Sequence, residues 1–201
     1  MFMKVCFLIA SILLSAAPSF AQSTHAATES AMSVSVGGEV STFNPDWGCV
    51  NRSPLACWNH QLLGIGGFVD ADHVIGKFGA EGEARWLHWR GPGGGLVQSN
   101  YLLGPRYQLF RRGDLSFSAK ALMGGSWMTL PNDLGHGSYF TMAPGGTLEY
   151  RLTKRLTLRG DYEYQLWPRF SGISTLPSNG LTPNGFSVGL SYRLWRSDRS
   201  Q

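Results

Sequence analysis

Apolar and polar side chains alternate along most of the chain with a period of two, the pattern of a strand with one apolar face. In segment 77–86, Phe78 and Trp86 share one face, while Glu83 and Arg85 share the other. The same division predicts further strands at 115–123, 156–166 and 186–194, and a weaker form of it predicts strands at 33–41, 61–70, 101–110 and 139–150. No stretch has a convincing helical period. The sequence therefore predicts an all-β fold of eight strands.

The predicted connections between these strands alternate in length. Short ones fall at 71–76, 111–114 and 151–155, and long ones fall at 43–59, 89–100, 126–138 and 168–184. Outer-membrane barrels have short periplasmic turns and long external loops. The pattern thus predicts an eight-stranded antiparallel up-and-down transmembrane β-barrel with both termini in the periplasm.

The N-terminal residues have the composition of an export signal. Lys4 precedes an apolar stretch, and Ser19-Phe20-Ala21 provides a small-x-small cleavage site. We therefore expect a signal peptide at 1–21, a flexible leader at 22–31, the barrel at 32–195 and a short tail at 196–201. In an oxidising compartment the two remaining cysteines, Cys49 and Cys57, would form a disulfide in the first long loop.

Composition excludes several other classes. The 201 residues are 43% hydrophobic and 15% charged with 26 glycines, which argues against a disordered chain or a coiled coil. After the signal peptide no apolar run is long enough for a membrane helix. Loss of Lys4 would lower the formal net charge of +4 by one. The remaining cations are scattered along the chain, so we expect no nucleic-acid partner.

The two faces of the strands are assigned by assuming a lipid environment. Charged side chains would pair in a closed lumen, which eight-stranded barrels fill with side chains: Lys77, Glu81, Glu83, Arg85, Arg106, Lys120, Glu149, Arg159, Asp161, Glu163 and Arg193. Apolar residues would face lipid: Phe78, Trp86, Phe117, Leu158, Tyr162, Phe186 and Leu190. The alternative is a soluble lipocalin-like barrel, in which the apolar face surrounds a greasy ligand and the charges face water.

Aromatic residues fit interfacial girdles at both ends of the strands. The external girdle would hold Trp86, Trp89, Tyr101, Trp127, Tyr139, Tyr164 and Trp167, and the periplasmic girdle would hold Tyr107, Tyr150, Tyr192 and Trp195. Pro105 and Pro144 lie inside predicted strands, where each removes a ladder hydrogen bond. We expect bulges beside Gly104 and Gly145 to accommodate them.

Several stretches resemble the small outer-membrane β-barrel proteins of the OmpA/OmpX and opacity-protein type. They are Gly-Phe-Val-Asp (67–70), Gly-Ala-Glu-Gly-Glu-Ala-Arg-Trp (79–86), Tyr-Leu-Leu-Gly-Pro-Arg-Tyr (101–107), Leu-Arg-Gly-Asp-Tyr-Glu-Tyr (158–164) and the last strand. In that strand Ser187, Gly189, Tyr192 and Leu194 are similar to the signal that such families present to the outer-membrane assembly machinery. The resemblance implies a Gram-negative-type envelope, with outer-membrane lipid and the assembly machinery as partners.

Candidate chemistry is sparse. His136 and Ser138 have a spacing similar to the His-x-Ser of outer-membrane lipid A deacylases, with Asp133 as the near candidate to orient the histidine. Five histidines lack a metal-ligand spacing, and no cofactor is implied. We predict a non-enzymatic barrel that anchors in the envelope and displays four external loops to possible ligands. The alternatives are a lipid A or phospholipid ester hydrolase using His136 and Ser138, a small-solute pore and a lipocalin-like binder.

Overall fold

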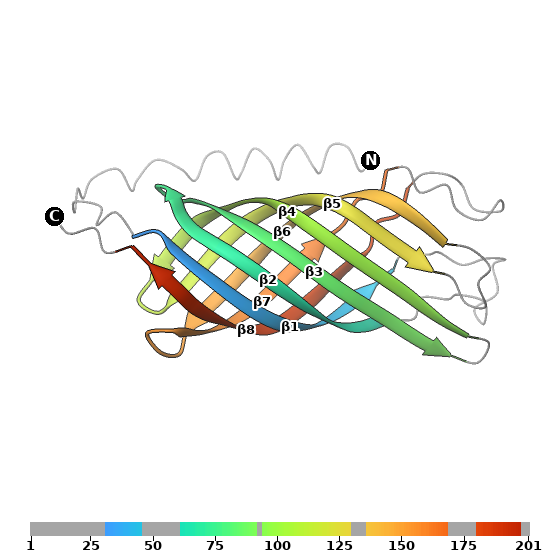
Figure 1. The fold of residues 1–201 in the computed structure, drawn as a ribbon, viewed down its shortest axis with the longest axis horizontal. Coiled ribbons are helices and arrows are strands. Elements are labelled where there is room, and N and C mark those ends of the chain that lie inside the picture. The colour runs from blue at the N-terminus through green and yellow to red at the C-terminus, as the bar shows by residue number, and fades with distance from the viewer. Residues whose placement is uncertain (1–30, 46–60, 92–93, 130–135, 169–179, 198–201) are drawn as a thin grey trace, which may run out of the picture. The chain divides into compact units, whose positions relative to one another are not determined.

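Eight antiparallel strands form a closed barrel in a computed structural model, which describes residues 31–45, 61–91, 94–129, 136–168 and 180–197. Each strand pairs with its neighbours along the chain, and β1 pairs with β8 to close the sheet (Figure 1). The strands are β1 (Ser33–Asn44), β2 (Leu62–Ile75), β3 (Phe78–Gly91), β4 (Gly94–Arg112), β5 (Leu115–Thr129), β6 (His136–Arg151), β7 (Leu156–Tyr164) and β8 (Asn184–Arg196). The predicted all-β, up-and-down barrel is confirmed. No helix in the described ranges is long and apolar enough to cross a membrane.

The barrel has two distinct ends. At one end, tight turns join β2 to β3, β4 to β5 and β6 to β7. Gly76 and Gly113 adopt positive φ angles of 61° and 62° in the first two of these turns, a conformation that glycine adopts without steric cost. Ser33 pairs with Arg196 at the same end. We call this the turn end and the opposite one the loop end.

Two connections at the loop end are shorter than the sequence indicated. Gly91 pairs with Gly94, so only residues 92–93 connect β3 to β4. Thr129 pairs with His136, which leaves 130–135 between β5 and β6. The predicted boundaries 89–100 and 126–138 were therefore wrong. Glycine and polar residues suggested loops there, but pairing between the two strands of each hairpin continues through them.

Both prolines lie in strands without the expected bulges. Register is continuous where Ala80 pairs with Pro105 and where Ala121 pairs with Pro144, so the bulges predicted beside Gly104 and Gly145 were wrong. Each proline instead coincides with a gap in the ladder on its other side, β4–β5 for Pro105 and β6–β7 for Pro144. A proline lacks one donor, so it interrupts one ladder and leaves the other intact.

Side chains alternate between the two surfaces of the barrel as period two requires. The seven residues predicted to face lipid all lie on the outer surface, where six are exposed and Phe117 is half-buried. Trp86 donates a hydrogen bond to the Tyr101 hydroxyl at 3.1 Å, and the Tyr101 ring meets Trp127 edge-on at a centroid distance of 5.4 Å. These three aromatics form an outer band toward the loop end.

Three aromatics predicted for the external girdle point inward instead. Trp167 is completely buried, and its ring stacks on Tyr139 at a centroid distance of 5.6 Å. Trp89 also packs against this cluster, which includes buried Phe43 and other apolar side chains. The girdle assignment considered only position along the strand. Strand parity decides the face, and these three residues share the parity of the lumen residues on their own strands.

A close approach inside the barrel requires glycine at position 37. A Cβ at Gly37 would overlap the ring of Phe68, which packs beneath the Arg159 guanidinium at 4.0 Å from the ring centroid. At neighbouring Gly38 the nearest atom to a Cβ is the Gly66 carbonyl oxygen, 3.7 Å away. The two adjacent glycines therefore differ in the space available.

We expect Gly37→Ala to destabilise the barrel by about 1–3 kcal/mol, because the added methyl displaces the Phe68 ring. The matched control Gly38→Ala should change stability by no more than about 0.5 kcal/mol. Urea unfolding of protein refolded in detergent would measure both effects. Equal losses for the two variants would contradict this account of the packing.

Candidate functional site

The central feature of the lumen is a network of buried ion pairs. Six carboxylates and four cations of the described strands are buried there: Glu39, Asp70, Glu81, Glu83, Asp161, Glu163, Arg85, Arg106, Lys120 and Arg159. Six of the eight strands contribute these residues, and the other two contribute immediate neighbours: Glu149 of β6, which bonds Arg106, and Ser187 of β8, which bonds Ser41. Burial of a charge is costly unless a counter-charge and hydrogen bonds compensate for it, so the positions of the pairs constrain how the strands can pack.

β7 contributes a row of inward-facing residues to this interior. Its inward residues run from the turn end toward the loop end as Arg159, Asp161 and Glu163, and Gln165 and Trp167 continue the row beyond the strand. The Gln165 side-chain amide donates to Glu163 Oε1 at 2.7 Å, and Trp167 Nε1 donates to Gln165 Oε1 at 3.0 Å. The row thus changes from charged to neutral polar to apolar along the barrel axis.

Arg106 and Arg159 occupy the part of the network nearest the turn end. Arg106 Nη1 lies 2.9 Å from Asp70 Oδ2, and Arg106 Nη2 lies 3.0 Å from Glu149 Oε1. Arg159 Nη1 lies 3.0 Å from the same Asp70 oxygen, and Arg159 also bonds Glu81. Asp70 is therefore shared between two guanidinium groups that come from β4 and β7.

Lys120 lies at the centre of the network. Its Nζ is 3.1 Å from Glu81 Oε1, 3.0 Å from Glu83 Oε2, 2.9 Å from Asp161 Oδ1 and 3.2 Å from Glu163 Oε2. One ammonium therefore contacts four carboxylates from β3 and β7. A lysine ammonium suits this position because it is a compact charge with three donors that can rotate toward different acceptors.

Arg85 completes the network toward the loop end. Its guanidinium lies 2.9 Å from Glu39 Oε1, 2.7 Å from Glu83 Oε1 and 3.2 Å from Glu163 Oε1. The same group lies over the Phe43 ring, 4.6 Å from the centroid. Arg85 thus links the charged network to the apolar cluster above it.

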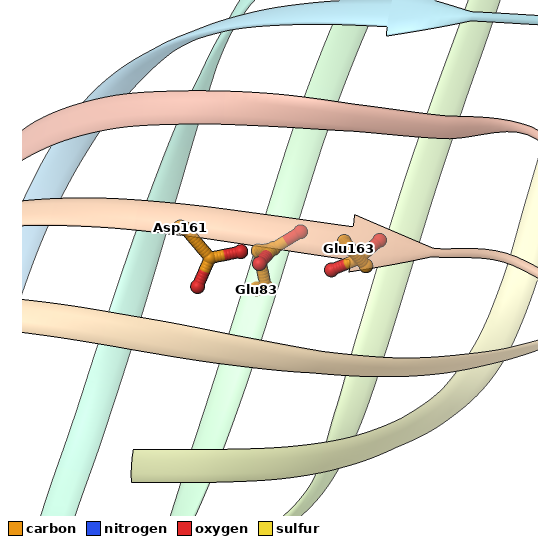
Figure 2. A group of neighbouring side chains, drawn as sticks. All are labelled: Glu83, Asp161 and Glu163. Carbon is orange, nitrogen blue, oxygen red and sulfur yellow. The ribbon is translucent and has the colours of Figure 1, made fainter. Parts of the chain in front are cut away.

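Three carboxylates of the network could in principle hold a metal ion. Glu83, Asp161 and Glu163 each place an oxygen within 4.8 Å of the others, and Figure 2 shows Glu83 between the two β7 side chains. Lys120 Nζ contacts all three at 3.2 Å or less. The ammonium thus supplies the positive charge that this group requires, and the geometry fits an internal ion pair better than a metal centre.

Apolar side chains fill the lumen toward the loop end. The buried members are Phe43, Leu62, Leu87, Leu96, Met128, Trp167 and Leu181. A polar layer next to them contains Ser126 and Thr141, whose hydroxyl oxygens are 2.6 Å apart. On β4, β5 and β6 a second, smaller apolar cluster of Leu102, Leu122 and Ala143 lies between the charged residues and this polar layer.

The structure places nine of the eleven predicted lumen charges in or beside the network. Lys77 was assigned wrongly, whereas Arg193 has the inward parity of β8 as predicted but lies outside the network. Lys77 is exposed in the turn between β2 and β3, whereas Arg193 is only partly buried and donates to the Lys154 carbonyl oxygen at 3.1 Å. Both lie at the turn end, beyond the closed part of the lumen.

Sequence reasoning missed Glu39, Asp70 and Asp72. Asp72 Oδ1 lies 3.4 Å from Arg106 Nε, while Glu39 and Asp70 are buried partners of Arg85 and of the two turn-end arginines. For Glu39 the sequence contains a signal in its alternation, because Ser33, Ser35, Glu39 and Ser41 share one face of β1. The valines on the opposite face identify this as the inner one.

The other candidate residues are dispersed. His136 and Ser138 both lie exposed on the outer face of β6. Asp133, Cys49 and Cys57 lie outside the described residues. Ser187 is buried and hydrogen-bonded to Ser41 at 2.8 Å. Of the other proposed assembly-signal positions, Gly189 faces inward, and Tyr192 and Leu194 are exposed on the outer face.

We expect Lys120→Met to destabilise the barrel by about 3–5 kcal/mol, because it leaves four carboxylates without their shared cation. Adding Glu83→Gln and Glu163→Gln to this variant should recover part of the loss. The control Lys77→Met, at an exposed lysine in the turn between β2 and β3, should be close to neutral. Urea midpoints in lipid vesicles would test this, and a near-neutral Lys120→Met would contradict the central role of Lys120.

Comparison with known proteins agrees with this architecture. The family model described as "Outer membrane protein beta-barrel domain" matches residues 7–193. No curated protein sequence matches the chain. Among solved structures, Neisserial surface protein A has a TM-score of 0.51 at 11% identity, with coverage of 80% of this chain and 96% of that chain. The outer membrane protein OprG from Pseudomonas aeruginosa has a TM-score of 0.52 at 15% identity, with coverage of 83% and 97%. At these identities the similarity concerns the fold, and the family match covers most of the sequence: the chain belongs to the outer membrane protein beta-barrel domain family.

Proposed function

We propose that this protein is a non-enzymatic integral outer-membrane protein that anchors in lipid and displays its loop end outside the cell. The observation that carries the proposal is the distribution of side chains across the barrel wall. Large apolar residues such as Val188 and Phe186 are more than 60% exposed on the outside, while ten charged groups are buried inside. A closed sheet that pairs its backbone groups around the circumference can reside in hydrocarbon.

The same distribution argues against the lipocalin-like alternative. A soluble barrel would expose charges and enclose an apolar ligand cavity. Here Arg85, Arg159 and Lys120 have fully buried side chains in the lumen, whereas apolar side chains cover the outer wall. Water around that wall would impose a large hydrophobic cost.

The pore and hydrolase alternatives receive less support from the geometry. The charged network and the apolar cluster occupy the interior of the described strands, as expected for an eight-stranded barrel. His136 and Ser138 lie on the outer wall of β6. The one acidic residue of that strand, Glu149, lies near its opposite end and bonds Arg106, so it does not orient His136. A surface role through the four connections at the loop end, segments 45–61, 92–93, 130–135 and 165–183, therefore remains the proposal.

Export and assembly would precede this role. Residues 1–21 would direct secretion and be removed, and the cysteines at 49 and 57 would form a disulfide after export. Ser187, Gly189, Tyr192 and Leu194 on β8 would present the signal for the assembly machinery. Because β8 pairs with β1, its docking would complete the barrel. Short turns would then face the periplasm, as in other outer-membrane barrels.

A charge placed on the outer wall should be costly in proportion to its depth in the membrane. We expect Leu103→Arg to destabilise the barrel in lipid by about 2–4 kcal/mol, because Leu103 is exposed on the outer wall at the midpoint of β4, far from both membrane interfaces. The control Leu152→Arg changes an exposed leucine in the turn between β6 and β7 and should cost about 1 kcal/mol or less. Equal costs in lipid vesicles would argue against a membrane-embedded wall.

The membrane assignment and the hydrolase alternative can be tested on one sample. Mature protein refolded in detergent or lipid should give a β-rich form that migrates faster on gels before boiling than after it. A soluble β-rich monomer in plain buffer would instead support the lipocalin-like fold. Lipid A or phospholipid hydrolysis that Ser138→Ala abolishes without unfolding would favour the enzyme, and single-channel conductance would favour the pore.

A further inference from the structure

Eight cationic side chains gather at the turn end of the barrel. They come from the three turns and from the end of β8, segments far apart in the sequence that the up-and-down topology brings to one rim. We call this set the basic rim, and its members are Lys77, Arg111, Arg112, Arg151, Lys154, Arg155, Arg193 and Arg196. The cations that appear scattered along the sequence are thus concentrated in space.

Nearby carboxylates do not neutralise the basic rim. Asp72 and Glu149 lie at the same end, but both contact Arg106 of the lumen, at 3.4 Å and 3.0 Å. Among the residues that the structure describes, the one carboxylate within 4 Å of a rim cation is Asp114, 3.9 Å from Arg151. The rim therefore has a large excess of positive charge.

The sequence of the segments that join strands at the opposite end has no such excess. These segments, with the adjoining end of β3, contain three arginines (Arg52, Arg90 and Arg169) and two aspartates (Asp46 and Asp133). A general need for solubility would not distinguish the two ends. The asymmetry favours an anionic surface as the partner of the turn end.

Interfacial aromatics lie at the level of the basic rim. Tyr150, Tyr192 and Trp195 are all exposed on the outer wall near the turn end, and such residues mark the boundary between hydrocarbon and headgroups. Arg155 Nη1 donates a hydrogen bond to the Tyr192 hydroxyl at 2.9 Å, and this bond raises the pKa of the Arg155 side chain. The contact places a guanidinium beside an aromatic residue of the interfacial type.

We propose that the basic rim binds the phosphate headgroups of anionic phospholipids in the leaflet around the turn end. This inference rests on the proposed insertion in the outer membrane and adds a preferred lipid partner. Guanidinium groups bind phosphate through paired hydrogen bonds, and basic residues beside a membrane attract anionic lipid. Arg112, Lys154 and Arg155 are the most suitable contacts, because all three are exposed and belong to two different turns.

The test uses the natural fluorescence of Trp195. Protein is refolded into phosphatidylcholine vesicles that contain phosphatidylglycerol, with the acyl chains of one lipid or the other brominated, and fluorescence quenching is recorded. Comparison with Trp195→Phe isolates the signal from the turn end. Three forms are compared: the wild type, a triple variant with Arg112→Gln, Lys154→Gln and Arg155→Gln, and a variant with Arg112→Lys and Arg155→Lys that keeps the charge.

We expect phosphatidylglycerol to be enriched around Trp195 by about fivefold. The enrichment should disappear in the triple variant and in about 0.5 M sodium chloride, which screens exposed charges, and should persist in the variant that keeps the charge. Quenching by each brominated lipid in proportion to its mole fraction in the vesicle would overturn the proposal, as would an enrichment that the triple variant retains. Co-sedimentation with peptidoglycan that the triple variant abolishes, without any lipid enrichment, would overturn it in favour of a polymer partner.

A separate control distinguishes failure of this inference from failure of the proposed function. Wild type and variants are first examined by gel mobility, boiled and unboiled, in vesicles of phosphatidylcholine alone. A wild type that does not fold in neutral lipid would argue against the membrane barrel itself. Folded barrels without lipid preference would overturn only the role of the basic rim.

Discussion

Pairing between β1 and β8 closes the sheet, and the other features of the barrel depend on this closure. It joins the first and last strands across most of the sequence and leaves the sheet without a free edge. Backbone groups that would otherwise be exposed find partners around the circumference, a condition for residence in hydrocarbon. Closure also creates an interior that only side chains can fill.

The interior then imposes its own electrostatic constraint. Glu39 on β1, Arg85 on β3 and Glu163 on β7 meet across the lumen although they are distant in sequence. Lys120 joins β5 to β3 and β7 through four carboxylates. A slip of one residue in any of these strands would turn its charges toward lipid and its apolar side chains inward. The network and the lipid-facing wall therefore favour the same register.

The two ends of the barrel have different chemistry. Toward the loop end, the lumen is filled by apolar side chains around Trp167, whereas the turn end carries the basic rim and the exposed aromatics Tyr150, Tyr192 and Trp195. This polarity would let one end interact with the outside and the other with an anionic surface. It arises from short turns rich in arginine and lysine, which strand pairing gathers at one end.

The sequence by itself determined the fold class and most of the inner and outer faces, because strand side chains alternate with a period of two that can be read without coordinates. Phe78 and Glu81 on β3 were assigned correctly in this way, as were Leu158 and Arg159 on β7. The same alternation predicts that Trp89, Tyr139 and Trp167 point inward, but their position near the strand ends suggested that they belong to the outer girdle. The extended β3–β4 hairpin could not be inferred, because its pairing overrides the loop preference of Gly91 and Gly94. Only the tertiary structure decided which charges meet, since partners such as Asp70 and Arg106 come from strands that are not neighbours and depend on the stagger of the closed barrel. The tertiary structure also gathers cations that are dispersed along the chain into one rim, because the up-and-down topology places all the short turns at the turn end.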